Sequence, residues 1–322
     1  MRATATAHPN IALVKYWGKR DGGRNLPAVG SLSITLDGMR TRTAVEFDPA
    51  LQSDEVTLNG RSDGGTAARV TACLDLLRDR AGRATRARVT SANDFPTGAG
   101  LASSASGFAA LAVAADRSLG LGLSLADLAE VARIGSGSAP RSLFGGFALL
   151  RNEPDGGVRC EPWLAAADWP LRVVVAITAT GPKATSSRDG MAASRDSSPL
   201  YREWVRSHDA DLAAGMAAVR QRDFAALAAV AERSCLKMHA VMFTTEPALI
   251  YWEPATVDCL QEIRKLRQRG TPVFFTIDAG PQVKAICEPA AVATVSATLA
   301  AVPGVSRVIE CGLGSGARIA DD

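Results

Sequence analysis

Histidine is scarce in this chain of 322 residues, which has only three, at positions 8, 208 and 239. No pattern among them predicts a catalytic triad or a metal-binding cluster. We expect His208 to be exposed and His239, which has apolar neighbours, to lie in the interior. The six cysteines are also far apart and include no CxxC pair. The sequence therefore predicts neither a zinc site nor a disulfide framework.

The chain also lacks long apolar runs and any strong excess of one charge. No stretch of about eighteen apolar residues predicts a transmembrane helix, and the first residues lack the apolar segment of a secretory signal. Lys plus Arg exceed Asp plus Glu by 36 − 33 = 3, which is too few to predict a duplex nucleic-acid binder. We expect a cytoplasmic protein that binds neither membrane nor nucleic acid.

Lysine is rare among the basic residues. Only six of the 36 are Lys, at positions 15, 19, 183, 237, 265 and 284, and the rest are Arg. Because a surface cation in this chain is usually Arg, each Lys is a candidate for a specific role. Lys15 and Lys19 lie close together after the apolar stretch 11–14. If Lys15 ends a strand there, one of the two can face a ligand.

Hydrophobic residues make up 47% of the chain, enough for a sizeable core. Alternating polarity predicts strands, and a three- and four-residue apolar spacing predicts helices. The expected strands are 31–36, 41–47, 55–58, 86–91, 171–178, 273–277, 283–287 and 307–311. The expected helices lie around 70–77, 108–115, 124–135, 212–219, 224–230 and 254–270. Asp37-Gly38 predicts that the first two strands form a hairpin.

The domain organisation follows from how these elements alternate. Strands and helices are interleaved in two blocks, which favours an α+β enzyme with two domains. A connector rich in Trp and Pro, residues 162–170, separates the blocks. We therefore predict domains at 1–168 and 169–322.

The strongest site pattern is the Gly- and Ser-rich segment 96–107, which leads directly into a predicted helix. Its glycines can turn backbone N–H groups inward, and the helix N-terminus adds positive potential, so an anion such as phosphate is the expected ligand. The alternative is a loop that only caps the helix. It is not a Walker A loop, because no GK[ST] follows. The match to GxGxxA at 312–317 has too few residues after it to form a helix that holds a pyrophosphate.

Two further segments carry chemistry. Residues 135–142 combine Ser136, Ser138 and Arg141, and hydroxyls with a guanidinium suit a carboxylate or a phosphate. A helix end followed by a turn is the alternative there. Asp278 follows the apolar strand 273–277 and precedes a Gly-Pro turn. Taken alone, this carboxylate caps the turn or serves as a catalytic group, and the pattern favours the cap.

Together, four segments resemble the diphosphomevalonate decarboxylase family, within the galactokinase/homoserine kinase/mevalonate kinase/phosphomevalonate kinase superfamily. They are 7–21, 95–108, 135–146 and 277–281, and the resemblance extends from about residue 7 to residue 287 in the family's order and spacing. It implies a small-molecule kinase superfamily fold of class α+β. The N-terminal domain would be like domain 2 of ribosomal protein S5 and the C-terminal domain ferredoxin-like. It also implies a cytoplasmic homodimer.

The resemblance also implies an activity. ATP with Mg²⁺ would phosphorylate the 3-hydroxyl of (R)-5-diphosphomevalonate, and loss of phosphate and CO₂ would leave isopentenyl diphosphate. Asp278 would act on the hydroxyl, Arg141 would hold the carboxylate, and Lys15 would lie near the transferred phosphoryl group. The residues implied to bind the substrate are Tyr16, Lys19, Ser136, Ser138, Arg141, Ser186 and Ser187. Those implied to bind ATP are Gly98, Ala99, Gly100, Leu101, Ala102, Ser103, Ser104 and Ser106. No protein ligand for Mg²⁺ is predicted.

The chain departs from the family pattern at a few positions. Pro140 precedes Arg141 where Cys or another small residue is usual, and Gln282 stands where Asn is usual. Relatives that act on 5-phosphomevalonate share most of these motifs, so isopentenyl phosphate is an alternative product. A mevalonate 3-kinase without decarboxylation and a non-catalytic ligand sensor also stay open as functions.

Overall fold

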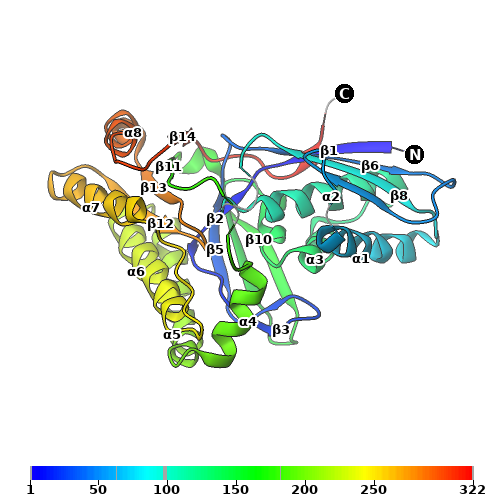
Figure 1. Cartoon of the computed structure of the whole chain (residues 1–322), viewed down its shortest axis with the longest axis horizontal. Helices are drawn as coiled ribbons and strands as arrows, with labels where there is room; N and C mark the ends of the chain where they lie inside the picture. Colours follow the sequence, from blue (N-terminus) through cyan, green and yellow to red (C-terminus); the bar gives the residue numbers. More distant parts are fainter. Residues whose placement is uncertain (1, 63, 97–99, 182, 321–322) are drawn as a thin grey trace.

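The computed structural model describes residues 2–62, 64–96, 100–181 and 183–320. Its strands are β1 (Arg2–Ala7), β2 (Asn10–Val14), β3 (Lys19–Asp21), β4 (Leu26–Pro27), β5 (Ser31–Thr35), β6 (Thr41–Phe47), β7 (Glu55–Leu58), β8 (Ala87–Asn93), β9 (Phe147–Asn152), β10 (Val158–Leu164), β11 (Arg172–Ile177), β12 (Val273–Ile277), β13 (Val283–Cys287), β14 (Arg307–Cys311) and β15 (Arg318–Ile319). Its α-helices are α1 (Gly64–Ala81), α2 (Ser103–Leu119), α3 (Leu125–Gly135), α4 (Ser187–Ser197), α5 (Tyr201–Gln221), α6 (Phe224–Phe243), α7 (Pro254–Gln268) and α8 (Val292–Ala300). The short 3₁₀ helices are η1 (Ala139–Leu143), η2 (Ala166–Asp168) and η3 (Pro289–Ala291). The predicted α+β class is confirmed (Figure 1).

Strands of the first half and the C-terminal β15 form a sheet of order β15-β1-β6-β8-β7. Helices α2 and α1 pack on this sheet, and α3 packs on both of these helices (Figure 1). Strand β6 alternates buried and partly exposed residues because one of its faces packs on these helices. The Ala-rich helix α2 lies in the centre, with Ala109, Ala112 and Ala115 fully buried. Small side chains allow α2 to approach the sheet closely, and its N-terminus is thereby held at a fixed place.

The predicted hairpin 31–47 is wrong, although both of its strands exist. Strand β5 pairs with β2 and β9 in a second sheet of order β10-β9-β5-β2, whereas β6 pairs with β1 and β8. The Asp37 side chain accepts a hydrogen bond from the Gly312 backbone N–H at 2.6 Å. The expected turn is therefore a crossover between sheets, stabilised by a segment that lies far away in the sequence.

The second half contains a sheet of order β12-β13-β11-β14 with helices on both faces. In β11, Val173, Val175 and Ile177 pack into the core that includes α5 and α6. The alternate residues Val174 and Ala176 pack on the other face against α7 and α8. A strand buried on both faces reads as a continuous apolar run, which is why residues 171–178 were recognisable in the sequence.

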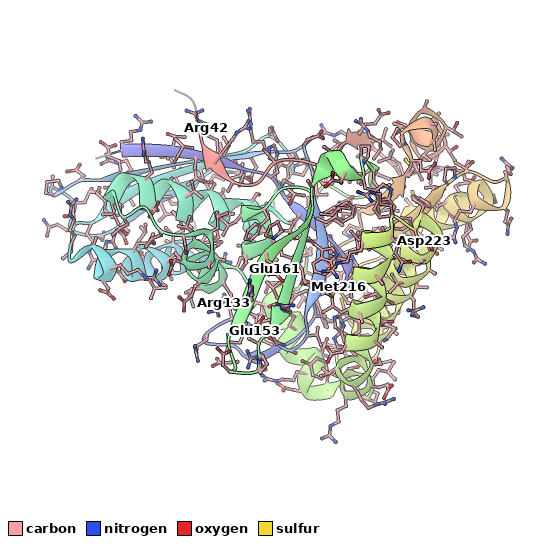
Figure 2. The ribbon with its side chains drawn as sticks, turned by 180° about the vertical axis from the view of Figure 1, so that it is seen from behind. Arg42, Arg133, Glu153, Glu161, Met216 and Asp223 are labelled. Carbon is pink, nitrogen blue, oxygen red and sulfur yellow. The ribbon has the colours of Figure 1, made fainter. Side chains whose placement is uncertain are left out.

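The two halves are connected by more than the linker between them. Residues 312–319 return to the first half, where β15 pairs with β1 and both chain ends lie together (Figure 1). The Gly314 N–H donates to the Thr35 carbonyl at 2.7 Å, and a Cβ at Gly314 would lie 2.7 Å from the Leu36 carbonyl oxygen. A further contact joins β10 to α5, where the Trp163 ring N–H donates to the Met216 carbonyl at 3.2 Å (Met216 is labelled in Figure 2).

No helix among the described residues combines the length and apolarity needed to cross a bilayer. Several helices and strands of the structure were not predicted from the sequence. These elements are strands β1, β3, β4, β9, β10 and β15 and helices α4 and α8. Strand β2 was anticipated only as an apolar stretch that Lys15 could follow. The prediction that a helix ends near residues 222–223 is confirmed, because Arg222 has a left-handed φ of 54° and Asp223 caps α6.

Candidate active site

A cavity of about 810 Å³ is lined by residues from both halves of the chain. Its walls include the residues that precede and begin α2, the segment 135–138, Arg141 and the turn at Asp278. Another part is lined by apolar side chains of β7, β8 and α1, among them Val56, Val89 and Val70. The cavity therefore joins a polar region rich in hydroxyls and cations to an apolar compartment.

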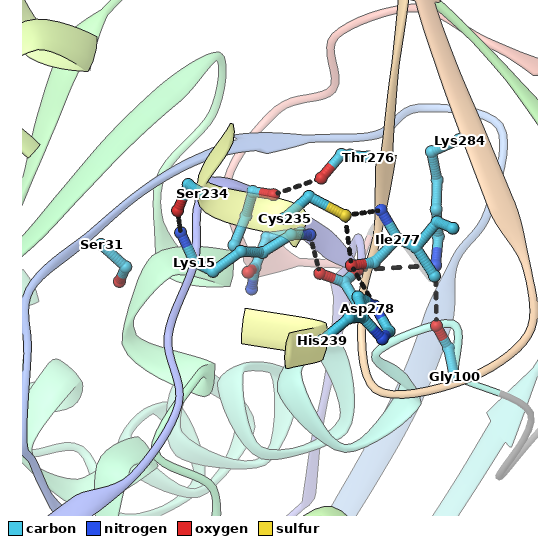
Figure 3. Close-up of polar contacts among 12 residues, drawn as sticks. Lys15, Ser31, Gly100, Ser234, Cys235, His239, Thr276, Ile277, Asp278 and Lys284 are labelled. Atoms are coloured by element: carbon cyan, nitrogen blue, oxygen red, sulfur yellow. Dashed lines mark hydrogen bonds and ion pairs between the residues drawn. The ribbon is translucent and has the colours of Figure 1, made fainter. Parts of the chain in front are cut away.

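Asp278 lies at the end of β12 with its side chain 24% exposed (Figure 3). Lys15, which directly follows β2, donates from Nζ to Asp278 Oδ1 at 2.6 Å, and Lys284 Nζ lies 3.5 Å from Oδ2. Burial raises the pKa of Asp278, but Lys15 and Lys284 outweigh that effect and lower it to about 2. Asp278 is therefore an ion-paired carboxylate rather than only a turn cap. It stays ionised at neutral pH.

Two more lysines in this region carry no motif of their own. Lys284 of β13 is 1% exposed, and Lys183 donates to Ser187 Oγ at 2.7 Å and to the Ala279 carbonyl at 2.9 Å. Burial lowers the pKa of Lys183 to about 8, with a further contribution from Lys284. Half of the chain's six lysines thus gather around one acid, so the scarcity of lysine was a signal that could have found them.

Arg141 is held in η1 by groups from both β2 and β5. It is 3% exposed, its Nε donates to Asn10 Oδ1 at 3.0 Å, and its Nη1 donates to Ser31 Oγ. Its guanidinium carbon lies 5.8 Å from the centroid of the Tyr16 ring. Asn10 and Ser31 were not predicted as site residues, and only the fold shows that they orient this guanidinium.

Tyr16 and the two Gly/Ser segments meet at the same wall of the cavity. Burial raises the pKa of Tyr16 to about 12, so its hydroxyl remains a donor, and among the described residues that buried hydroxyl has no hydrogen-bond partner. Ser136 Oγ lies 3.2 Å from Ser104 Oγ and 3.3 Å from Ser138 Oγ. These hydroxyls from two separate segments form a continuous polar wall suited to phosphate oxygens.

Lys19 stands on the small β3–β4 ribbon and lines the cavity. Its Nζ donates to Asn25 Oδ1 at 2.5 Å, and Asn25 in turn donates to the Ile134 carbonyl at 2.6 Å. Burial lowers the pKa of Lys19 to about 8, and the nearby cations Arg188 and Arg69 lower it further. The three cations Lys19, Arg69 and Arg188 outnumber Asp189, the carboxylate that acts on Lys19, and such an excess of positive charge indicates a site for a polyanion.

The predicted ATP loop is described from Gly100 onward; Gly98 and Ala99 lie outside the described residues. Gly100 has a φ of 79°, and a Cβ there would lie 2.9 Å from Gly280 Cα, so the loop packs directly on the Asp278 turn. Gly100, Leu101, Ala102, Ser103 and Ser104 line the cavity. Ser106 does not, because its hydroxyl lies 2.6 Å from Thr41 Oγ1 and donates to the Ser103 carbonyl.

Ser186 and Ser187 lie where α4 begins, at the cavity wall. Ser186 caps the helix by accepting from the Asp189 N–H at 3.2 Å, and its hydroxyl donates to Asp189 Oδ2 at 2.7 Å. Ser187 accepts from Lys183 at 2.7 Å. Ser186 thus has a local structural role, while Ser187 and Lys183 together present polar groups to the cavity.

The departures from the family pattern have local explanations. Pro140 occupies the first turn of η1, where a missing N–H costs nothing. Gln282 is fully buried, accepts from the Thr178 N–H at 2.7 Å and donates to the Ala179 carbonyl. It ties the end of β11 to the turn that carries Asp278.

The histidines do not enter the site. The expectation that His208 is exposed is wrong, because it is fully buried and its Nε2 lies 2.9 Å from the Gly30 carbonyl. His239 is interior, as predicted, and burial lowers its pKa to about 3. Burial also lowers the pKa of His208 to about 4, so both imidazoles are neutral at physiological pH. Among the described residues, no group of three His, Cys, Asp or Glu side chains is arranged to hold a metal ion.

Comparisons with known proteins agree with this site. The diphosphomevalonate decarboxylase-like N-terminal domain matches residues 7–160, and the mevalonate 5-diphosphate decarboxylase C-terminal domain matches residues 173–313. A diphosphomevalonate decarboxylase from Gibberella zeae is 36% identical over 87% of this chain and 79% of its own length. A phosphomevalonate decarboxylase from Haloferax volcanii is 34% identical over 88% of this chain and 87% of its own.

Solved structures show the same fold. A structure of MDDEF in complex with MVAPP, AMPPCP and magnesium has a TM-score of 0.91 and 37% identity, covering 100% of this chain and 99% of its own. The chain has the two-domain α+β fold of the small-molecule kinase superfamily. Within that class, it belongs to the diphosphomevalonate decarboxylase family.

Proposed function

We propose that this chain catalyses the ATP-dependent decarboxylation of (R)-5-diphosphomevalonate to isopentenyl diphosphate, ADP, phosphate and CO₂. The observation that carries the proposal is a single cavity that brings together ionised Asp278, buried Arg141 and the two Gly/Ser segments. Membership of the family and similarity to a structure described with MVAPP and AMPPCP support it.

The reaction needs little covalent chemistry from the protein. A tertiary hydroxyl is a poor leaving group, and phosphorylation turns it into a good one. When the phosphate leaves, positive charge develops at C3, and the electrons released as CO₂ departs quench it. Positioning and charge placement therefore supply most of the catalysis.

The residues present can supply these functions. Asp278 orients the 3-hydroxyl or accepts its proton, and its negative charge favours the cation that forms at C3. Arg141, already oriented by Asn10 and Ser31, presents its guanidinium to the substrate carboxylate. Lys15 stabilises the phosphoryl group in transfer and keeps Asp278 charged.

The 5-diphosphate binds at the polar end of the cavity. Tyr16, Ser136 and Ser138 offer hydroxyl donors, and Lys19 offers an ammonium. At the start of α4, Ser187 and its partner Lys183 offer polar groups to the 5-diphosphate, whereas Ser186 is engaged in capping the helix. The loop from Gly98 to Ser104 holds the ATP phosphates, with Ser103 and Ser104 at the start of α2; Ser106 contributes to packing instead.

Mg²⁺ arrives with ATP as part of the co-substrate. The site fits this ion, because Mg²⁺ is usually bound by phosphate oxygens, waters and one or two protein oxygens rather than by a complete protein cage. Asp278 and Ser104 both line the cavity and are oxygen donors of the kind the ion prefers. The ion would neutralise charge on the phosphates during transfer.

The number of phosphates on the substrate is the finer question. The similarity to a phosphomevalonate decarboxylase favours, as a second candidate, the same chemistry on 5-phosphomevalonate, giving isopentenyl phosphate. The cations Lys19, Arg188 and Arg69 around one end of the cavity favour the diphosphate, because the second phosphate adds negative charge there. A kinase that stops at the 3-phosphate would not need both Asp278 and the positioned Arg141.

Three aspects of organisation belong to the same proposal. The division into domains 1–168 and 169–322 is supported by the separate matches at 7–160 and 173–313. In that division the last residues, 312–319, pack on the first domain. We also propose that the protein works in the cytoplasm as a homodimer, as the family resemblance implies.

The direct test compares mevalonate, 5-phosphomevalonate and 5-diphosphomevalonate as substrates with ATP and Mg²⁺. We expect the highest kcat/KM with the diphosphate and isopentenyl diphosphate as its product. A preference for the monophosphate would select the second candidate. ATP binding without ADP formation on all three would favour a non-catalytic sensor.

A further inference from the structure

Lys284 occupies an unusual place for a charged residue. It is in β13, between β12 and β11, where it faces Thr276 on one side and Val175 on the other in the strand register. Its side chain is 1% exposed. Burying an ammonium in the middle of a sheet costs stability, and an apolar residue would serve the fold better. The position therefore calls for a functional explanation.

The Lys284 ammonium connects two parts of the site that are distant in the sequence (Figure 3). Its Nζ donates to the carbonyl of Gly100 at 3.0 Å and lies 3.5 Å from Asp278 Oδ2. Gly100 belongs to the loop that precedes α2, and this loop packs on the turn of Asp278 because Gly100 approaches Gly280. One cation thus contacts both the proposed nucleotide loop and the proposed catalytic acid.

We propose that Lys284 is a positioning residue for the decarboxylation. Its ammonium fixes the position of Asp278 relative to the nucleotide loop. This inference rests on the proposed function. Lys15 holds Oδ1 of Asp278, and Lys284 restrains Oδ2, so the carboxylate plane is fixed from two sides. Because the same ammonium holds Gly100, a displaced loop also weakens the restraint on the acid.

The surroundings of Asp278 distinguish this role from general charge neutralisation. The groups that act on it electrostatically come from separate elements: Lys15 after β2, Arg141 in η1, Lys183 before α4, Cys235 and His239 in α6, and Lys284 itself. Lys15 alone already forms a close ion pair with the acid. Of these cations, Lys284 is the one with a hydrogen bond to the described part of the nucleotide loop.

The test compares two neutral variants with the wild-type enzyme, whose turnover of 5-diphosphomevalonate first establishes the proposed function. Lys284→Met removes the charge and the donor, so kcat should fall about 10–100-fold and KM for ATP should rise. Lys284→Gln keeps a donor for Gly100, so its KM for ATP should stay closer to the wild-type value. In both, the acid limb of the kcat–pH profile should move to higher pH, because Asp278 loses a cation that lowers its pKa.

Two controls separate positioning from folding. Lys265→Met removes an exposed lysine of α7 that pairs with Glu262, and its kinetics should match the wild type. Lys284→Arg keeps the charge and should recover part of kcat and the wild-type acid limb. Thermal unfolding and the fraction of protein able to bind ATP are measured for every variant.

The outcomes are distinct. An inactive wild type removes the proposed function and this inference with it. An active wild type whose folded Met or Gln variant keeps normal kcat and an unmoved acid limb overturns the inference alone. The inference is also overturned if both neutral variants fail to fold while Lys284→Arg has wild-type kinetics. In that case Lys284 serves the fold only.

Discussion

Asp278 shows what a single residue contributes to this enzyme. Its carboxylate lies at the end of an apolar strand, where burial alone would favour the neutral acid, yet two lysines hold it ionised. Burying ion pairs costs free energy, and a residue that only caps a turn needs none. The turn alone therefore does not explain this arrangement. The arrangement is explained if a charged acid at this point is needed for the reaction.

Replacing Asp278 by Asn tests that role. The variant retains the shape of the side chain but neither accepts a proton nor carries charge, so kcat should fall about 10²–10⁴-fold. ATP affinity, measured by calorimetry, should remain near the wild-type value. Asp258→Asn, at an exposed position on α7, is the matched control and should be fully active. Near-normal turnover of the Asp278 variant would remove this residue from the mechanism.

The pH dependence on the alkaline side should report two other residues. The pKa values of Lys183 and Lys19 are both lowered to about 8, chiefly by burial, so each ammonium loses its proton as pH rises through that value. Since kcat/KM reflects the free enzyme, it should decline above about pH 8. In Lys183→Arg the guanidinium stays charged, and the decline should be shallower. A profile that stays flat to pH 10 in the wild type would contradict both assignments.

Several site residues could be predicted from the sequence because they stand in motifs. Asp278, Arg141 and the two Gly/Ser segments have local patterns, and the scarcity of lysine singled out Lys15 and Lys19. Asn10 and Ser31 could not be found this way, since their importance comes only from contacts with Arg141 across more than a hundred residues of chain. The role of Ser106 was not predictable either, because its side-chain direction depends on how α2 lies against β6.

At the scale of elements, periodicity identified most strands and helices but not all their partners. All residues of β5 are buried, whereas buried residues alternate with more exposed ones in β6. This difference distinguishes a strand of an interior sheet from a strand with a solvent-facing side. The turn signal at Asp37-Gly38 suggested a hairpin, but a contact with Gly312 stabilises a crossover instead. Local turn chemistry cannot reveal a partner that lies 275 residues away in the chain.

The loop before α2 offers a prediction at this scale. Gly100→Ala combines a left-handed φ of 79° with a Cβ that would lie 2.9 Å from Gly280 Cα, so the loop must move away from the Asp278 turn. We expect KM for ATP to rise about tenfold or more and kcat to fall, as steady-state kinetics would show. Gly82→Ala is the matched control, because it has a φ of 61° but no atom within 4 Å of the added Cβ. It should lose about 1 kcal/mol of stability and keep normal kinetics. Equal kinetics in both variants would contradict the role given to the loop.

At the scale of the whole molecule, the cavity exists because two α+β units meet around it. The predicted α+β class and the two interleaved blocks were accessible from the sequence. The return of residues 312–319 to the first half was not, since a Gly-rich segment without hydrophobic periodicity gives no signal of where it packs. Close backbone contacts, such as that of Gly314 with Leu36, explain why glycine occurs in this segment, and binding of a dinucleotide is not needed to explain it.

Deleting residues 312–322 tests the importance of that returning segment. The deletion removes at least six hydrogen bonds: two between Gly312 and Asp37, those of Gly314 with Thr35 and Gly146, that of Ala317 with Ser142 and that of Ala320 with Thr4. At about 1 kcal/mol for each bond, the free energy of unfolding should fall by about 6 kcal/mol. Activity should also fall, because Ser142 follows Arg141 in η1. Ile319→Ala, a change at a partly exposed side chain of β15, should leave stability within about 0.5 kcal/mol of the wild type. An unchanged unfolding curve for the truncated chain would show that the segment contributes nothing to the assembly of the site.

The most direct measurement is the ratio of CO₂ released to ADP formed when the purified protein turns over 5-diphosphomevalonate with ATP and Mg²⁺. We predict one CO₂ for each ADP, with isopentenyl diphosphate accumulating at the same rate. ADP formed without CO₂, together with a stable 3-phosphorylated product that retains its carboxylate, would contradict decarboxylation and identify a kinase.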